Sequence, residues 1–171
     1  MSTDARAFAI AAHGDQKYGE LPYVHHLDQV AALAAPHGSE AQTVAYLHDV
    51  VEDTGTSLAD IEARFGAHVA ACVDLLTDGP GATRKERKAK AYARMAGVRG
   101  PLELALLVKA ADRLANVRAC VADGFESQWR TYQGEHPTFR QAAHRPGLCD
   151  DLWEELDRLM AQWPPSEAAG R

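Results

Sequence analysis

The residues of this 171-residue chain best suited to chemistry lie in one short run, His48-Asp49-Val50-Val51-Glu52-Asp53. On a continuous helix its first two side chains stand one turn before its last two, so all four share one side and the valines enter the core. Three carboxylates then crowd a helix C-terminus, where the helix dipole disfavours each by about 0.3–1 kcal/mol. A bound cation reverses this cost. The run therefore indicates a metal site, with a solvated acidic helix end as the alternative.

A metal ion needs ligands from other parts of the chain as well. His25 and His26 follow a loop and open a predicted helix, and Asp112 lies inside a long apolar helix. The apolar stripe of that helix has 3,4,3,4 spacing and consists of Leu107, Ala110, Leu114, Val117 and Val121. Asp112 lies on the opposite, small and partly polar side and is predicted to be buried. A buried carboxylate is either paired, here with Lys109 or Arg113, or bound to a metal.

The segments that position these residues read as helices separated by short turns, and no segment alternates apolar and polar residues as a strand would. Capping residues, Gly and Pro breaks and apolar spacing predict helices at about 2–13, 26–35, 39–53, 57–65, 69–77, from 83 onward, 101–123, 126–145 and 149–163. Ser39 with Gln42 and Ser57 with Asp60 are predicted capping boxes, and residues 14–22 a loop. Pro164-Pro165 is the predicted final stop. The prediction is an all-α single domain, residues 1–171, of about eight to ten helices.

Composition narrows the class of protein. With 46% hydrophobic and 25% charged residues, the chain is typical of a globular domain, and its net charge of −6 argues against a general nucleic-acid-binding face. No run of eighteen apolar residues predicts a membrane span, and the N-terminus lacks a secretory pattern. Three cysteines without a CxxC pair are typical of a reducing compartment. We therefore expect a cytoplasmic protein, and its oligomeric state stays open.

His26, His48-Asp49 and Asp112 together form an H…HD…D pattern, and the sequence resembles the HD-domain phosphohydrolases. The resemblance is to the hydrolase domains of RelA/SpoT-type alarmone enzymes, the metazoan SpoT homologues and the small alarmone hydrolases. It covers roughly residues 5–118 and continues more faintly to 139. The matching segments are Gln16 with Gly19, Pro22-Tyr23-Val24-His25-His26, Leu47-His48-Asp49-Val50-Val51-Glu52-Asp53-Thr54, Phe65-Gly66, Leu76-Thr77-Asp78 and Val108-Lys109-Ala110-Ala111-Asp112-Arg113-Leu114-Ala115-Asn116-Val117-Arg118.

The resemblance implies a site for one divalent metal, usually Mn²⁺. Its implied ligands are His26, His48, Asp49 and Asp112. Two imidazoles and two carboxylates suit a divalent transition ion that keeps positions open for water and substrate. Glu52 and Asp53 match the acidic pair that acts on the attacking water. In the family the reaction releases pyrophosphate from the ribose 3′ position of ppGpp or pppGpp, so the expected partner is a small nucleotide, not nucleic acid or a membrane.

Substrate contacts are implied in the same way. Arg84 stands where relatives have a phosphate-contacting Lys, and Asn116 matches a pocket Asn. Arg130 and Tyr132 match a phosphate-contacting Arg and Tyr. The other basic residues of the Arg84 helix are expected to be solvated; they are Lys85, Arg87, Lys88 and Lys90.

The first loop departs from the family pattern. Relatives have Arg-Lys there, with the Arg stacked on guanine, whereas this chain has the shorter Gln16-Lys17-Tyr18-Gly19, and Leu27 replaces the usual Pro after the ligand histidine. Lys17 and Tyr18 thus replace the base-contacting wall, and Tyr18 could stack on a purine or simply cover the loop. We expect a weaker preference for guanine over adenine than in these relatives.

Two other functions remain open. One is a different HD phosphatase, acting on a nucleoside monophosphate or on the 2′-phosphate of NADPH. The other is an inactive HD domain that only binds a nucleotide. The intact ligand set and the Glu52-Asp53 pair favour an enzyme, and the length leaves no room for an alarmone synthetase domain.

Overall fold

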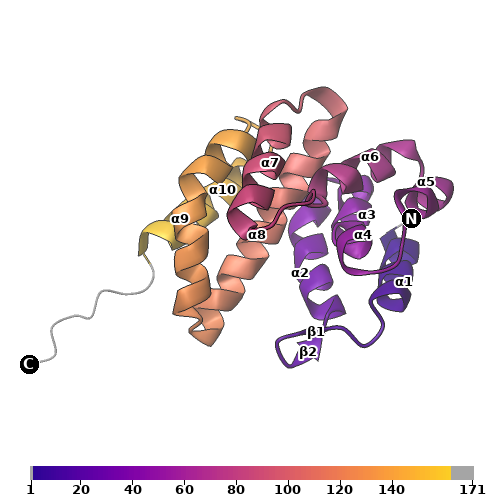
Figure 1. Cartoon of the computed structure of the whole chain (residues 1–171), viewed down its shortest axis with the longest axis horizontal. Coiled ribbons are helices and arrows are strands. Elements are labelled where there is room, and N and C mark those ends of the chain that lie inside the picture. The colour runs from indigo at the N-terminus through magenta and orange to yellow at the C-terminus, as the bar shows by residue number, and fades with distance from the viewer. Residues whose placement is uncertain (1, 163–171) are drawn as a thin grey trace, which may run out of the picture.

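The computed structural model describes residues 2–162, and this part of the chain is built of helices joined by short turns (Figure 1). In order, the elements are α1 (Ser2–His13), β1 (Lys17–Tyr18), β2 (Leu21–Pro22), α2 (Val24–Ala34), the 3₁₀ helix η1 (Ala35–His37), α3 (Ser39–Leu47), α4 (Val50–Asp53), α5 (Leu58–Phe65), α6 (Ala67–Leu76), α7 (Arg84–Ala96), the 3₁₀ helix η2 (Gly100–Leu102), α8 (Glu103–Asp123), α9 (Glu126–Ala143) and α10 (Asp150–Gln162). The predicted all-α class is confirmed. The predicted helix end at Trp163 and the stop at Pro164-Pro165 lie outside the described residues.

Helix α8 occupies the centre of the molecule. It packs against α2, α3 and α6 on one side and against α9 and α10 on the other (Figure 1). A helix covered on both sides must be apolar nearly all round, and Leu106, Val108, Ala111 and Leu114 are fully buried. This central position carries Asp112, which lies in the same stretch of α8, into the interior.

The helix predicted to run through the HD motif is interrupted. Helix α3 ends just before His48, and α4 begins at Val50. Between them Asp49 has φ −104° and ψ −4°, in the sparsely populated bridge region outside the helical range. The backbone bond from Asp53 N to Asp49 O, 2.9 Å, carries the chain into α4. Because of the break, His48 is fully buried while the two carboxylates of α4 are exposed.

Two capping predictions have different outcomes. The Ser57–Asp60 capping box is present in both directions at the start of α5. The Ser39–Gln42 box is wrong, because Gly38 is the N-cap of α3 and makes no side-chain cap. Gly38 adopts φ +112°, a conformation that favours glycine. Ser39, the predicted N-cap, is therefore already the first residue of α3.

The first loop contains a short antiparallel hairpin that the sequence did not predict. Lys17 pairs with Pro22 and Tyr18 with Leu21, and Gly19 between them has φ +59°. Two-residue strands are too short to show alternation, which explains why the pattern was missed. The hairpin lies at one end of α2 (Figure 1) and directs Tyr18 toward that helix.

The described part of the chain, residues 2–162, contains no helix with the length and apolar character that crossing a membrane requires. The three cysteines, Cys72, Cys120 and Cys149, are free thiols buried in the core. They pack as small apolar side chains.

His68 joins three elements near the surface and should make stability depend on pH. Its Nδ1 lies 3.1 Å from Glu40 Oε1 on α3, and its Nε2 lies 3.1 Å from the carbonyl oxygen of Pro101. The hydrogen bond with Glu40 raises the pKa of His68 above its ordinary value, against the opposing effect of burial. The resulting stabilisation is fully present below the unfolded pKa near 6.5 and is lost as the pH rises through the folded pKa.

We therefore expect His68→Gln to lower the free energy of unfolding of the metal-free protein at pH 5.5, by less than about 1 kcal/mol because the side chain is partly exposed. The difference from the wild type should shrink toward pH 9. Urea unfolding at pH 5.5, 7 and 9 measures it, with His25→Gln as the control because that exposed ring hydrogen-bonds the neutral side chain of Gln29, at 3.2 Å, and not a carboxylate. A difference that is the same at every pH would contradict this role of His68.

Candidate metal centre

Four side chains from three segments converge in the interior. They are His26 of α2, His48 and Asp49 from the junction between α3 and α4, and Asp112 of α8. His48 Nε2 lies 2.9 Å from Asp49 Oδ2 and 3.6 Å from Asp112 Oδ1, and His26 Nε2 lies 3.3 Å from Asp112 Oδ1. One ligand atom each of His26, His48 and Asp49 lies within 4.8 Å of the others. This is a spacing that a single cation can bridge.

The donor atoms fit a divalent metal. His48 Nδ1 donates to the carbonyl oxygen of Ala45, 2.7 Å away, which leaves Nε2 directed at the two carboxylates. That Nε2 is buried and has no hydrogen-bond partner of suitable geometry, and a buried polar atom in this state costs about 1–3 kcal/mol. A cation at this point satisfies it. Metal-binding histidines are oriented in the same way, by a hydrogen bond from the other ring nitrogen.

The electrostatics of the centre favour positive charge. Burial alone raises the pKa of the Asp49 carboxyl, but His48 outweighs it and holds this pKa below the ordinary value. Burial likewise opposes ionisation of Asp112, and Lys109 together with the two histidines holds its pKa well below the usual range. Burial lowers the pKa of His48, but Asp49 and Asp112 raise it to about 10. Both carboxylates are therefore charged at neutral pH and attract a cation, which competes with the proton on His48.

A second layer of side chains holds the ligands in place. Lys109 Nζ lies 3.0 Å from Asp112 Oδ2, while Asn116 Nδ2 donates to Asp112 Oδ1 at 2.7 Å. The hydroxyl of Tyr23 donates to Asp49 Oδ2 at 2.5 Å. The sequence left open whether Asp112 forms a salt bridge or binds a metal. In the structure Asp112 Oδ2 pairs with Lys109, and Asp112 Oδ1 faces His26 and His48.

Glu52 and Asp53 are exposed on α4, one turn beyond the HD motif, and each is held by a separate contact. Gln16 Nε2 donates to Asp53 Oδ2 at 2.8 Å, and His13 Nδ1 hydrogen-bonds Gln16 Oε1 at 2.8 Å. The backbone N–H of Asp78 donates to Glu52 Oε2 at 3.0 Å. The first loop and the segment after α6 thus fix the acidic pair at the surface next to the buried centre. His13 carried no sequence signal for this role, because its partner Gln16 acts on Asp53, which is 37 residues further along the chain.

Two cavities are lined by several of the residues predicted to bind substrate. The first, about 820 Å³, lies between the hairpin and the end of α8, and Lys17 and Tyr18 line it. The second, about 700 Å³, lies at the start of α9, and Arg84 and Tyr132 line it. Arg84 Nε also lies 2.7 Å from Glu135 Oε1, which offsets part of its charge. Both volumes are in the range of small-molecule sites.

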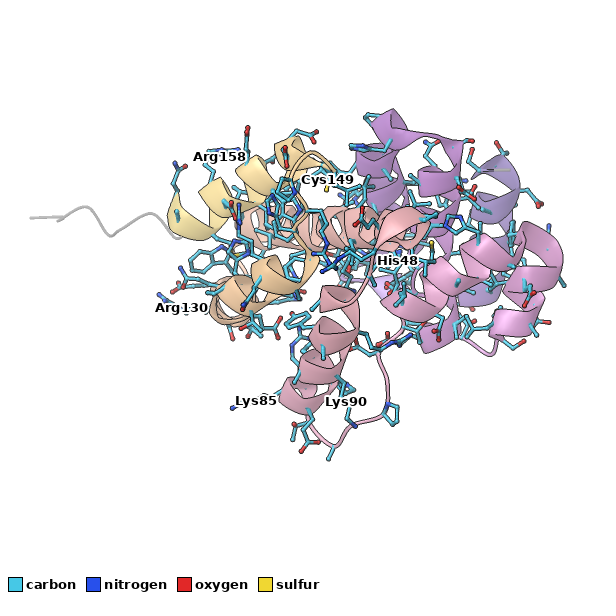
Figure 2. All side chains as sticks on the ribbon, turned by 90° about the horizontal axis from the view of Figure 1, so that it is seen from above. His48, Lys85, Lys90, Arg130, Cys149 and Arg158 are labelled. Carbon is cyan, nitrogen blue, oxygen red and sulfur yellow. The ribbon has the colours of Figure 1, made fainter. Side chains whose placement is uncertain are left out.

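The structure does not bring Arg130 to either cavity. Its side chain is exposed and pairs with Glu126 on its own helix, and Figure 2 shows it at the outer edge of the molecule, far from His48. Gln128 lines both cavities instead and donates to the Tyr132 hydroxyl at 3.1 Å. The i,i+4 spacing of Gln128 and Tyr132 is the signal that would have identified the residue sharing this face of α9.

Lys88 is wrongly predicted to be solvated. Lys85 does extend outward from α7 (Figure 2), and Lys90 is exposed but donates to the carbonyl oxygen of Pro80 at 2.7 Å. Lys88 Nζ, however, lies 2.8 Å from Asp78 Oδ2, and both side chains are largely buried. Burial lowers the pKa of Lys88, and the positive charge of Lys109 adds to this effect. The pair is linked to Glu52, because the backbone N–H of Asp78 donates to the Glu52 carboxylate.

A helical bundle with two histidines and two aspartates converging at an H…HD…D motif defines the class of protein. In agreement, the family model described as HD domain matches residues 5–149. This match covers most of the chain, and the chain therefore belongs to the HD-domain family.

Curated relatives and a solved structure refine the comparison. The chain is 35% identical over 160 residues to a probable guanosine-3′,5′-bis(diphosphate) 3′-pyrophosphohydrolase of Synechocystis, covering 90% of the chain and 21% of the relative. It is 34% identical over 137 residues to the guanosine-3′,5′-bis(diphosphate) 3′-pyrophosphohydrolase MESH1 of Xenopus tropicalis, covering 73% and 74%. A solved metazoan ortholog of SpoT that hydrolyses ppGpp has a TM-score of 0.76 at 25% identity, with 94% of each chain covered. The chain spans about a fifth of the length of the Synechocystis and Aquifex aeolicus relatives.

The geometry predicts that each chain binds one divalent metal ion. His48→Ala and Asp112→Ala should each abolish tight binding, because each removes one of four converging ligands. Mn²⁺ should raise the melting temperature of the wild type through mass action but not that of these variants. Equilibrium dialysis with metal analysis gives the stoichiometry, and His25→Ala is the matched control since its ring is exposed. Two ions per chain, or unchanged binding by His48→Ala, would contradict the four-ligand centre.

Proposed function

We propose that this protein hydrolyses the 3′-pyrophosphate of guanosine-3′,5′-bis(diphosphate) or a related purine nucleotide, releases pyrophosphate, and uses Mn²⁺ as its one divalent cation. The observation that carries the proposal is the convergence of four side chains, which are His26, His48, Asp49 and Asp112. The Glu52-Asp53 pair follows two of them, His48 and Asp49, by one turn of the chain. The names of the Xenopus, Danio rerio and human relatives support the substrate class.

The roles of the residues follow from their positions. Glu52 and Asp53 are accessible carboxylates, held by Asp78 and Gln16, that can orient a water molecule and accept its proton. The divalent cation, when bound, acts as a Lewis acid that polarises the phosphoryl oxygens. Tyr23 and the residues around Asp112 keep the ligands in place, so the carboxylates of the centre do not need to reorient during the reaction.

The two cavities suit different parts of a nucleotide. The cavity at the start of α9 offers Arg84, the Tyr132 hydroxyl and Ser127, which can contact phosphate oxygens. The cavity beside the hairpin is bordered by Leu21 and Phe125, which are unusually exposed for large apolar residues, and can accept a purine ring. Because no arginine of residues 2–162 lines the cavity beside the hairpin, we propose that guanine and adenine are discriminated only weakly.

The remaining expectations are part of the same proposal. We place the protein in the cytoplasm, where three free thiols remain reduced. Its partner is the nucleotide substrate, and neither nucleic acid nor a membrane is needed for the reaction.

Product analysis distinguishes this function from its alternatives. The purified protein with Mn²⁺ should release pyrophosphate from ppGpp, pppGpp and their adenine analogues, with values of kcat/KM for the two bases within about a hundredfold, or about 3 kcal/mol. Phosphate and pyrophosphate are measured separately, and NADPH and nucleoside monophosphates are included. Phosphate alone, released from NADPH or a monophosphate, would indicate the other HD phosphatase. Nucleotide binding without turnover would indicate an inactive module.

Substitution of the acidic pair should separate catalysis from metal binding. Glu52→Gln and Asp53→Asn keep the side-chain shape but remove the charge, so each should retain one Mn²⁺ while turnover falls by at least about a hundredfold. Metal analysis and initial rates are measured on the same samples. Glu62→Gln, an exposed carboxylate change on α5, is the control. Near-normal turnover in both variants would refute the catalytic assignment, and complete loss of Mn²⁺ would make the pair ligands.

A further inference from the structure

Tyr18 of the hairpin lies directly against one of the metal ligands. Its ring is stacked on the imidazole of His26, with centroids 4.8 Å apart and an interplanar angle of 16°. Such a contact fixes the plane of the imidazole, and with it the direction of the His26 Nε2 lone pair. One face of the Tyr18 ring is therefore already covered by protein.

The hydroxyl of Tyr18 reaches toward a second ligand. It donates to Asn116 Oδ1 at 2.9 Å, and Asn116 Nδ2 donates to Asp112 Oδ1 at 2.7 Å and to the Asp112 carbonyl oxygen at 3.0 Å. Burial raises the pKa of Tyr18, so the phenol stays neutral and remains a donor. The bond from Tyr18 decides which end of the Asn116 amide faces Asp112, because only the Oδ1 end can accept it.

These contacts differ from those of a base-stacking residue. The sequence leaves open whether Tyr18 stacks on a purine or only covers the loop. We infer that Tyr18 is a positioning residue of the metal centre, whose ring orients His26 of α2 while its hydroxyl, through Asn116, orients Asp112 of α8. The inference rests on the proposed function only in taking this centre as the working site. It requires metal affinity, and not nucleotide affinity alone, to depend on Tyr18.

Metal binding by the full chain tests this directly. The protein is stripped with a chelator and titrated with Mn²⁺, and free Mn²⁺ is followed by electron paramagnetic resonance. Tyr18→Phe keeps the stacked ring and loses the hydroxyl, so affinity should fall roughly three- to tenfold. Tyr18→Leu loses both contacts, and affinity should fall about ten- to a hundredfold, as for other residues that orient metal ligands. Tyr18→Phe alone decides the matter if Tyr18→Leu does not fold, as judged by its melting curve in EDTA.

A double-mutant cycle excludes a merely structural effect. Because the Tyr18 hydroxyl acts through Asn116, Tyr18→Phe should weaken Mn²⁺ binding in the wild type but add nothing in Asn116→Ala. If the two substitutions weakened Mn²⁺ binding independently, their fold-losses of affinity would instead multiply in the double variant. Tyr46→Phe is the matched control, since its hydroxyl bonds Asp28 at 3.0 Å and none of the four ligands, and its Mn²⁺ affinity should stay within about twofold of the wild type.

The outcomes separate this inference from the proposed function. Wild-type Mn²⁺ affinity in Tyr18→Phe and Tyr18→Leu would overturn the inference, and a raised KM for nucleotide in those variants would then identify Tyr18 as a base-stacking residue. If no nucleotide of the panel is hydrolysed while the predicted order of Mn²⁺ affinities is found, the positioning role holds and the proposed function fails.

Discussion

The structure depends on the burial of two carboxylates beside two imidazoles. Asp49 and Asp112 approach the same His48 Nε2, and both pKa values are held low although burial opposes ionisation. An unpaired buried charge costs several kcal/mol, so the surrounding groups must supply positive charge or hydrogen bonds. Lys109 supplies positive charge at Asp112 Oδ2. Asn116 and the Tyr23 hydroxyl donate to Asp112 Oδ1 and Asp49 Oδ2, the two oxygens that also face His48 Nε2.

Three features of the fold make this arrangement possible. Helix α8 is covered on both sides and carries Asp112 inward, and the break between α3 and α4 turns His48 into the interior while leaving Glu52 at the surface. The hairpin of residues 17–22 then closes over α2 with Tyr18. His26 and Asp112 are thus held on helices, and His48 and Asp49 at the junction between α3 and α4, while the carboxylates proposed to act on water are exposed.

The likeness to the HD-domain family extends over residues 5–149, up to the start of α10. A TM-score of 0.76 at 25% identity shows that the helical frame tolerates extensive replacement of its surface. The metal centre needs four side chains at fixed positions, and Tyr18 of the hairpin contacts one of them directly.

Sequence alone was sufficient for the all-α class and the Ser57–Asp60 cap, because these depend on local spacing. The candidate ligands came from the resemblance to the HD-domain phosphohydrolases, since they lie in three segments that only the fold brings together. The sequence predicted a continuous helix through the HD motif, since no local signal marks a break that packing around His48 imposes. Lys88 was expected to be solvated and Arg130 to contact phosphate, yet Lys88 is buried against Asp78 and Arg130 is exposed. Only the tertiary structure decides such cases, because the partner that selects each position comes from another part of the chain.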